Sequence, residues 1–146
     1  MNKNRFIISI IILFIDQLIK LIIQNNNINI INKYISIIYV KNTGAAFSIL
    51  SGNNILLIIL SIIMFLLIYY ISKNYHDILS DISFGLIYGG LFGNLLDRII
   101  YGYVRDYISV ISFPIFNIAD MSIVIGVILL IIYEIKEEIH NANNSK

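Results

Sequence analysis

Cysteine is absent from the 146 residues, and histidine occurs only twice. Without cysteine the chain can form no disulfide, thiol nucleophile or thiolate metal site. The two histidines, His76 and His140, lie in polar stretches, so we expect neither a histidine-rich zinc site nor a Ser-His-Asp triad. Any catalysis must therefore rely on Asp, Asn, Arg, Lys and Tyr side chains.

Charge is also scarce in this chain. Charged residues make up 13% of the sequence, whereas soluble domains carry about 25%. The formal net charge is only +1, so no nucleic-acid partner is expected. With 58% hydrophobic residues and a mean hydropathy of +0.84, the sequence indicates a membrane protein.

Four apolar segments are long enough to cross a bilayer, which requires about 20 residues per helix. They lie in a single multi-pass domain over 1–146, as helices at residues 6–23, 55–71, 82–96 and 118–135. The first segment contains Asp16 and Lys20, whose insertion cost is offset by the surrounding Ile, Leu and Phe. A secretory signal peptide would also follow Lys3 and Arg5, but no small-residue cleavage site comes after it, so we expect a retained helix.

Four spans place both termini on one side of the membrane, and Lys3 and Arg5 favour the cytoplasm for that side. The links 24–54 and 97–117 then face outside. The approximate alternation of Tyr34–Ile37 in the first link favours short strands. The expected fold is therefore an all-α membrane protein with four transmembrane helices and a small extracytoplasmic β-rich segment between the first two.

Glycines recur at steps of four in the third segment, at Gly85, Gly89 and Gly93. This spacing places them on one helix face, where the backbone of a neighbouring helix can approach closely. The pattern predicts a packing surface and carries no information about chemistry.

Polar side chains within and next to the spans need a reason to be there. Asn94, Asp97 and Arg98 stand at i, i+3 and i+4, so they share one helix face. Asp97 and Arg98 could pair with one another or with lipid phosphates, and for Asp97 a structural role is favoured. Asp16 and Lys20, also four residues apart, could neutralise each other inside the bundle.

Two further acids lie at the outer ends of the third and fourth segments. Asp106 is in the link between them, and Asp120 shares the first turn of the fourth helix with Asn117. Asn117 could simply cap that helix, with Asp120 favourably placed near its start. The link is long enough to bring Asp106 and Asp120 together. Asn42-Thr43-Gly44, in the other outer link, is by itself a turn signal.

A pair of neighbouring acids has a definite chemistry. Because like charges repel, one acid stays protonated while the other is ionised, and the two titrate as a unit. The ionised acid can activate water while the protonated acid donates to a carbonyl oxygen, which hydrolyses an amide. Acid pairs also bind cations, so the residues alone leave both uses open.

Five blocks of residues together resemble one known family, lipoprotein signal peptidase (signal peptidase II). The matches follow the family order from the first predicted helix to the fourth. They are Asp16-Gln17-x-x-Lys20, Asn42-Thr43-Gly44-Ala45-Ala46-Phe47-Ser48, Gly89-Gly90-x-x-Gly93-Asn94-x-x-Asp97-Arg98, Val104-x-Asp106-Tyr107 and Phe116-Asn117-x-Ala119-Asp120.

The resemblance implies an aspartyl endopeptidase of the bacterial cytoplasmic membrane that removes signal peptides from prolipoproteins, cutting just before a diacylglyceryl-modified cysteine. It implies a lipidated prolipoprotein and membrane lipid as partners, a monomer, no metal and no cofactor, with the site at the outer face. Phe47 and its loop would cover that site. The residues it implicates are Asp106 and Asp120 as catalytic, Asn42, Asn94, Arg98 and Asn117 as substrate-binding, and Asp16, Lys20 and Asp97 as structural support.

One block departs from the family pattern, since Arg105 and Tyr107 stand where the family commonly has valine and phenylalanine. If the link is extended, Arg105 points away from the face that presents Asp106. If it is not, the cation would lower the pKa of Asp106 and bias it towards the base role.

Two alternatives come from other functional classes. A metal-dependent lipid-phosphate transferase could also use outward-facing acids, although the dense acidic cluster of a Mg²⁺ site is missing from the sequence. A small ion transporter would instead use Asp16 as a site near the middle of the membrane.

Overall fold

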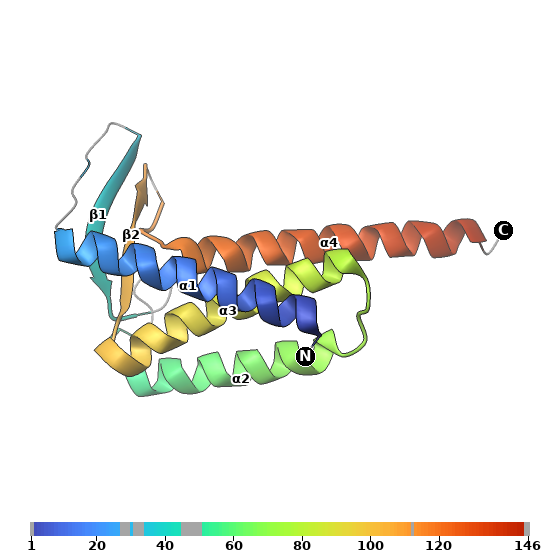
Figure 1. Ribbon diagram of the computed structural model, residues 1–146, viewed down its shortest axis with the longest axis horizontal. Helices are drawn as coiled ribbons and strands as arrows, with labels where there is room; N and C mark the ends of the chain where they lie inside the picture. The colour runs from blue at the N-terminus through green and yellow to red at the C-terminus, as the bar shows by residue number, and fades with distance from the viewer. Residues whose placement is uncertain (1, 27–29, 31–33, 45–50, 112, 145–146) are drawn as a thin grey trace.

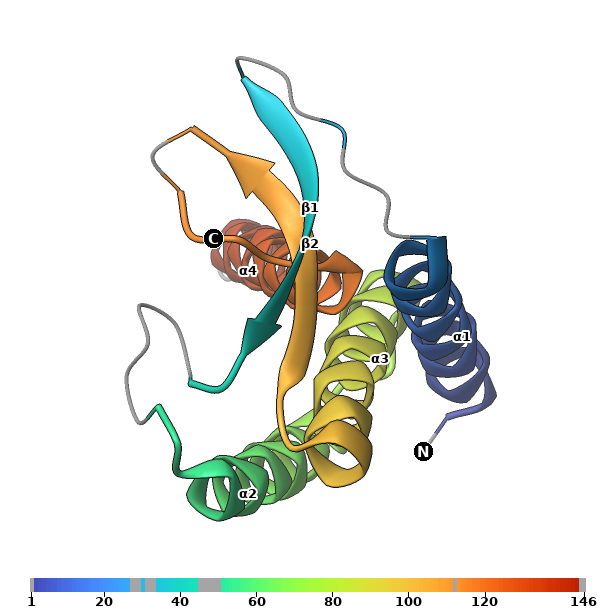
Figure 2. The same ribbon diagram turned by 90° about the vertical axis from the view of Figure 1, so that its left-hand side faces the viewer.

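The computed structural model describes residues 2–26, 30, 34–44, 51–111 and 113–144. Its elements, in chain order, are α1 (Lys3–Asn26), β1 (Ile35–Asn42), α2 (Asn54–Ser72), α3 (Ile78–Tyr101), β2 (Val104–Val110) and α4 (Ile118–Asn144). Helix α3 lies at the centre and packs against the other three helices (Figures 1 and 2). In the described part of the chain, four helices are long and apolar enough to cross a membrane. The predicted all-α membrane fold is therefore confirmed.

The helices run past the bounds that hydropathy suggested. For example, α4 continues beyond residue 135 to Asn144. Its last turns, from Glu134, contain Glu, Lys and His, which are compatible with a helix but not with the membrane interior. An apolar window detects only the part of a helix that contacts lipid.

The bundle is polar inside and apolar outside. Asp16, Lys20 and Asp97 are fully buried, whereas Phe14 is 67% exposed and Ile55 is 75% exposed. Apolar side chains facing lipid carry no cost because lipid tails are equally apolar, while charged groups must turn inwards and pair. The burial pattern is that of a membrane protein.

The glycine face of α3 packs closely against α1, as the spacing predicts. A Cβ atom added at Gly89 would lie 2.6 Å from Ile12 Cβ and 2.9 Å from the Ser9 carbonyl oxygen. On another face of α3, a Cβ at Gly90 would overlap the Ala119 carbonyl oxygen of α4 and lie 2.6 Å from Ser122 Oγ. These approaches place the middle of α3 between α1 and the start of α4.

The two strands form an antiparallel sheet at one end of the bundle (Figure 2). The register pairs Val40 with Asp106 and Asn42 with Val104, with an irregularity between Ile37 and Val40. Strand β1 confirms the predicted strand in the first link. Its partner β2 was not predicted, because the sequence Val104–Val110 is polar at Arg105 and Asp106 in succession and so lacks clean alternation.

The connection from α3 to β2 depends on Gly102. Its φ of +80° is the left-handed conformation that glycine adopts without strain, and its N–H donates to the Arg98 carbonyl oxygen at 3.2 Å. The helix therefore ends at Tyr101, and β2 begins only two residues after the cap, at Val104. This tight turn carries the acid at position 106 back over the end of the bundle.

We expect Gly90→Ala to lower the free energy of unfolding by about 1–3 kcal/mol, because the new methyl group must push α3 and α4 apart. The measurement is unfolding of the purified protein in detergent micelles. Ile99→Ala, at a lipid-facing position of the same helix, is the control and should change stability by less than about 0.5 kcal/mol. Equal stability of the two variants would contradict the close packing of α3 on α4.

Candidate active site

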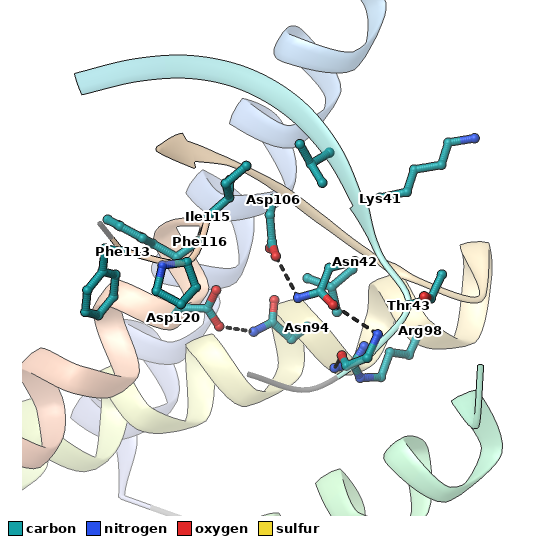
Figure 3. Close-up of a pocket in the computed structure, with 14 residues that line it drawn as sticks. Lys41, Asn42, Thr43, Asn94, Arg98, Asp106, Phe113, Ile115, Phe116 and Asp120 are labelled. Carbon is teal, nitrogen blue, oxygen red and sulfur yellow. Dashed lines mark hydrogen bonds between the residues drawn. The ribbon is translucent and has the colours of Figure 1, made fainter. Parts of the chain in front are cut away.

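A pocket of about 540 Å³ opens at the end of the bundle that carries the strands. Residues from β1, α3, β2 and the start of α4 line it. Asp106 and Asp120 both face this pocket, together with Asn42, Asn94 and Arg98 (Figure 3). The structure thus brings together residues that are far apart in the sequence.

Asp106 is held on β2 by two side-chain amides. Asn42 Nδ2 donates to its Oδ2 at 2.8 Å, and Asn117 Nδ2 donates to its Oδ1 at 2.7 Å. Asn42 reaches Asp106 because it pairs with Val104, which lies two residues before Asp106 and therefore on the same strand face. Burial raises the pKa of Asp106 to about 6, and the charge of Asp120 adds to the rise, while the two amides oppose it.

Asp120 is held in the first turn of α4. Asn94 Nδ2 donates to its Oδ1 at 2.7 Å, and the backbone N–H of Asn117 donates to its Oδ2 at 3.2 Å. In return, Asn117 Oδ1 accepts the backbone N–H of Asp120 at 3.0 Å, a reciprocal capping arrangement. Asn117 therefore caps α4 and, through its Nδ2, also contacts Asp106.

Arg98 extends along the pocket towards the Asn42 turn. Its Nη2 donates to the Gly44 carbonyl oxygen at 3.0 Å, and Asn42 Oδ1 accepts the Gly44 N–H at 3.0 Å, the side-chain contact of an Asx-turn at the end of β1. Arg98 Nη1 is buried and has no hydrogen-bond partner among the described residues. The expectation that Phe47 covers the site falls outside the described residues.

Beneath the pocket lies a fully buried ion cluster of four side chains. Lys20 Nζ lies 2.8 Å from Asp16 Oδ2 and 3.2 Å from Asp97 Oδ2. Arg105 Nη2 lies 2.7 Å from Asp97 Oδ1, and the Arg105 backbone N–H donates to Asp97 Oδ2 at 2.9 Å. The cluster joins α1, α3 and β2. It contains two cations and two anions, so its net charge is zero.

The contacts of Arg105 decide between the two alternatives for this residue, which stands where the family commonly has valine. Strand β2 is extended, so Arg105 and Asp106 point to opposite faces, as the extended alternative predicts. Asp97 pairs with Arg105 and Lys20 rather than with Arg98. The guanidinium also donates to the side-chain oxygens of Gln17 at 2.7 Å and Gln24 at 3.3 Å.

Some residues of the site were not foreseen from the sequence. The apolar wall of the pocket comes from Phe113, Pro114, Ile115 and Phe116. The single proline of the chain, between aromatic residues in an outward link, was the available signal. Within the described ranges, no group of three or more His, Asp or Glu side chains is arranged to hold a metal ion.

A family model described as signal peptidase (SPase) II matches residues 8–136. The chain belongs to this family. A lipoprotein signal peptidase of Halothermothrix orenii is 41% identical over 140 residues, covering 91% of this chain and 96% of the relative. One from Enterococcus faecalis is 36% identical over 142 residues, covering 91% and 88%.

Two solved structures of bacterial membrane enzymes share this fold. A bacterial membrane enzyme determined by the in meso method at 2.3 Å resolution superposes with a TM-score of 0.83 at 33% identity, covering 92% of this chain and 88% of that one. A second, at 1.9 Å resolution, gives 0.79 at 34% identity, covering 90% and 92%. The family is a peptidase family with bacterial relatives, and the match supports neither the lipid-phosphate transferase nor the ion transporter.

We expect Asp97→Leu to lower the free energy of unfolding by about 3–5 kcal/mol, because Lys20 and Arg105 lose a buried anionic partner. Chemical unfolding in detergent micelles measures the loss. Glu138→Leu removes an exposed carboxylate on α4 and serves as control, with little expected change. A similar small effect of both substitutions would contradict a stabilising role for the cluster.

Proposed function

We propose that this signal peptidase II is an aspartyl endopeptidase that removes the signal peptide from prolipoproteins. Cleavage occurs just before a cysteine that carries a diacylglyceryl group. One observation carries the proposal: Asp106 and Asp120 line the same pocket, and each is held by neutral amide donors rather than by a cation. The family and the names of its relatives supply the substrate class.

The proposed reaction needs one proton shared between two acids. The ionised acid takes a proton from water, and the resulting hydroxide attacks the scissile carbonyl carbon. The protonated acid gives its proton to the carbonyl oxygen, so a neutral gem-diol forms. In the collapse, the acid that took the proton from water gives it to the leaving nitrogen. The other acid, now ionised, takes a proton from a gem-diol hydroxyl as the carbon–nitrogen bond breaks, which restores the acid pair. The raised pKa of Asp106 supports such sharing near neutral pH.

Neutral and cationic donors around the pair would hold the extended peptide. The buried Arg98 Nη1, without a partner among the described residues, is a donor for a substrate carbonyl. The apolar wall that includes Phe113 and Phe116 would contact the side chains next to the cleaved bond. In this proposal Asn42 and Asn94 orient the acids and also line the peptide site. Asn117 is fully buried and is not a lining residue, so it acts by orienting the acids.

The proposed site lies at the outer face of the bacterial cytoplasmic membrane, with both termini in the cytoplasm. Lys3 and Arg5 at the start of α1 and Lys73 at the end of α2 support this orientation, because these helix ends lie at the end of the bundle opposite the two strands (Figure 1). Helix α2 packs mainly against α3, so the substrate's signal helix can reach the bundle sideways from the lipid while its acyl chains stay there. One copy of the chain contains all the proposed catalytic groups, so a monomer suffices.

Asp106→Asn and Asp120→Asn should each reduce cleavage at least a hundredfold, about the contribution of one acid or base. The assay is a gel shift of a diacylglyceryl-modified precursor with the purified enzyme in detergent, with the unmodified precursor expected to stay uncut. Asp77→Asn, at the far end of the bundle, should retain activity. Wild-type turnover by either Asn variant would refute the aspartyl mechanism.

The pH dependence of kcat/KM should be bell-shaped, with one limb near pH 6 that belongs to the pair. Asn42→Ala removes a donor that favours ionised Asp106, so the pKa rises and this limb moves to higher pH. Thr43→Ala changes a neighbouring pocket residue without a bond to Asp106 and should leave the limb in place. If the limb stays at the same pH in Asn42→Ala, then Asp106 is not the group whose titration produces it.

A further inference from the structure

The Asn94 side chain links the buried ion cluster to the acidic pair. Its Oδ1 accepts hydrogen bonds from Lys20 Nζ at 3.2 Å and from Asn117 Nδ2 at 3.1 Å. Its Nδ2 donates to Asp120 Oδ1 at 2.7 Å. A flipped amide would point its NH₂ group at two donors and its oxygen at a carboxylate, so these contacts permit one orientation.

Lys20 also acts on the acids through its charge. Its side chain is fully buried, where solvent screens a charge far less than at the surface. Against the effects of burial and of Asp120, Lys20 lowers the pKa of Asp106. Within the described part of the chain, the other titratable groups around the pair are Asp16 on α1, Lys41 on β1, Arg98 on α3 and Tyr107 on β2.

We propose that Lys20 is a positioning residue for the peptidase reaction: its buried ammonium group, 3.2 Å from Asn94 Oδ1, keeps the Asn94 amide turned towards Asp120. Lys20 lies beneath the pocket and is not among its lining residues, so it acts through Asn94 and through its field rather than on the peptide. This role rests on the proposed aspartyl mechanism and goes beyond structural support.

Arg105 offers a matched control because it shares the structural role of Lys20 but not its link to the acids. Both are fully buried cations paired with Asp97, at 3.2 Å for Lys20 and 2.7 Å for Arg105. Arg105 otherwise contacts Gln17 and Gln24 on the far face of β2. A lysine that only balanced the charge of Asp97 would behave like Arg105.

The test compares Lys20→Gln with Arg105→Gln in the full-length protein in detergent, using the lipidated precursor over a range of pH and thermal unfolding in parallel. Both variants should unfold at lower temperature. Lys20→Gln should lower kcat by about tenfold or more with little change in KM. Arg105→Gln can also lower kcat, because Arg105 anchors β2 beside Asp106, so the pH profile separates the two variants. Only Lys20→Gln should move both limbs of the profile up by about one pH unit. The inference is overturned if the limbs of the pH profile move equally in both variants, or if they do not move in Lys20→Gln.

Lys20→Arg covers the case in which Lys20→Gln does not fold. It keeps a cation between Asp16 and Asp97, so the limbs should stay in place, but the larger guanidinium cannot reproduce the ammonium contact with Asn94, so kcat should fall. A wild-type kcat in Lys20→Arg overturns the positioning role.

The Asp106→Asn and Asp120→Asn variants separate the two possible failures. Turnover by either one shows that the aspartyl mechanism itself is wrong. If both are inactive while Lys20→Gln behaves like Arg105→Gln, the mechanism stands and only the role of Lys20 is wrong.

Discussion

The position of the acids depends on the pairing of charges inside the bundle. An unpaired charge among lipid-facing helices is costly, so each buried cation must meet an anion. Asp97 of α3 meets this need for two elements at once, since it binds Lys20 of α1 and Arg105 of β2. The strand is thereby fixed to the helices at the residue next to Asp106, and the site inherits its geometry from the ion cluster below.

The acids themselves are surrounded by a different kind of partner. Asp106 and Asp120 accept hydrogen bonds from asparagine amides, which orient a carboxylate without adding a full charge. A cation in direct contact would favour two ionised acids, and the pair would then lack the proton that it must donate. Arg98, a cation of the pocket wall, instead donates to a backbone oxygen, that of Gly44. Buried cations therefore join the helices and the strand through ion pairs, whereas asparagine amides orient the two acids through hydrogen bonds.

The sequence predicts those features that follow from local periodicity. Hydropathy locates the spans, and the steps of four between glycines predict the close approach seen at Gly89. The partners of Asp97 could not be predicted in the same way, because they come from two other elements. From spacing alone, its neighbour Arg98 was an equally good candidate for the ion pair with Asp97. Strand β2 was not predicted because both of its faces carry buried polar groups. Arg105 on one face and Asp106 on the other are adjacent in the sequence, so the alternation of polar and apolar residues is lost.

The succession of Arg105 and Asp106 is what fixes the register of the sheet. A slip of one residue would exchange the two faces of β2. Asp106 would then face Asp97, placing like charges together in a buried site, and Arg105 would enter the pocket beside Asp120 and be lost as the partner of Asp97. The ion cluster therefore does more than hold the bundle closed. It makes the alternative register unfavourable, and so selects the one in which an acid, and not a cation, faces Asp120.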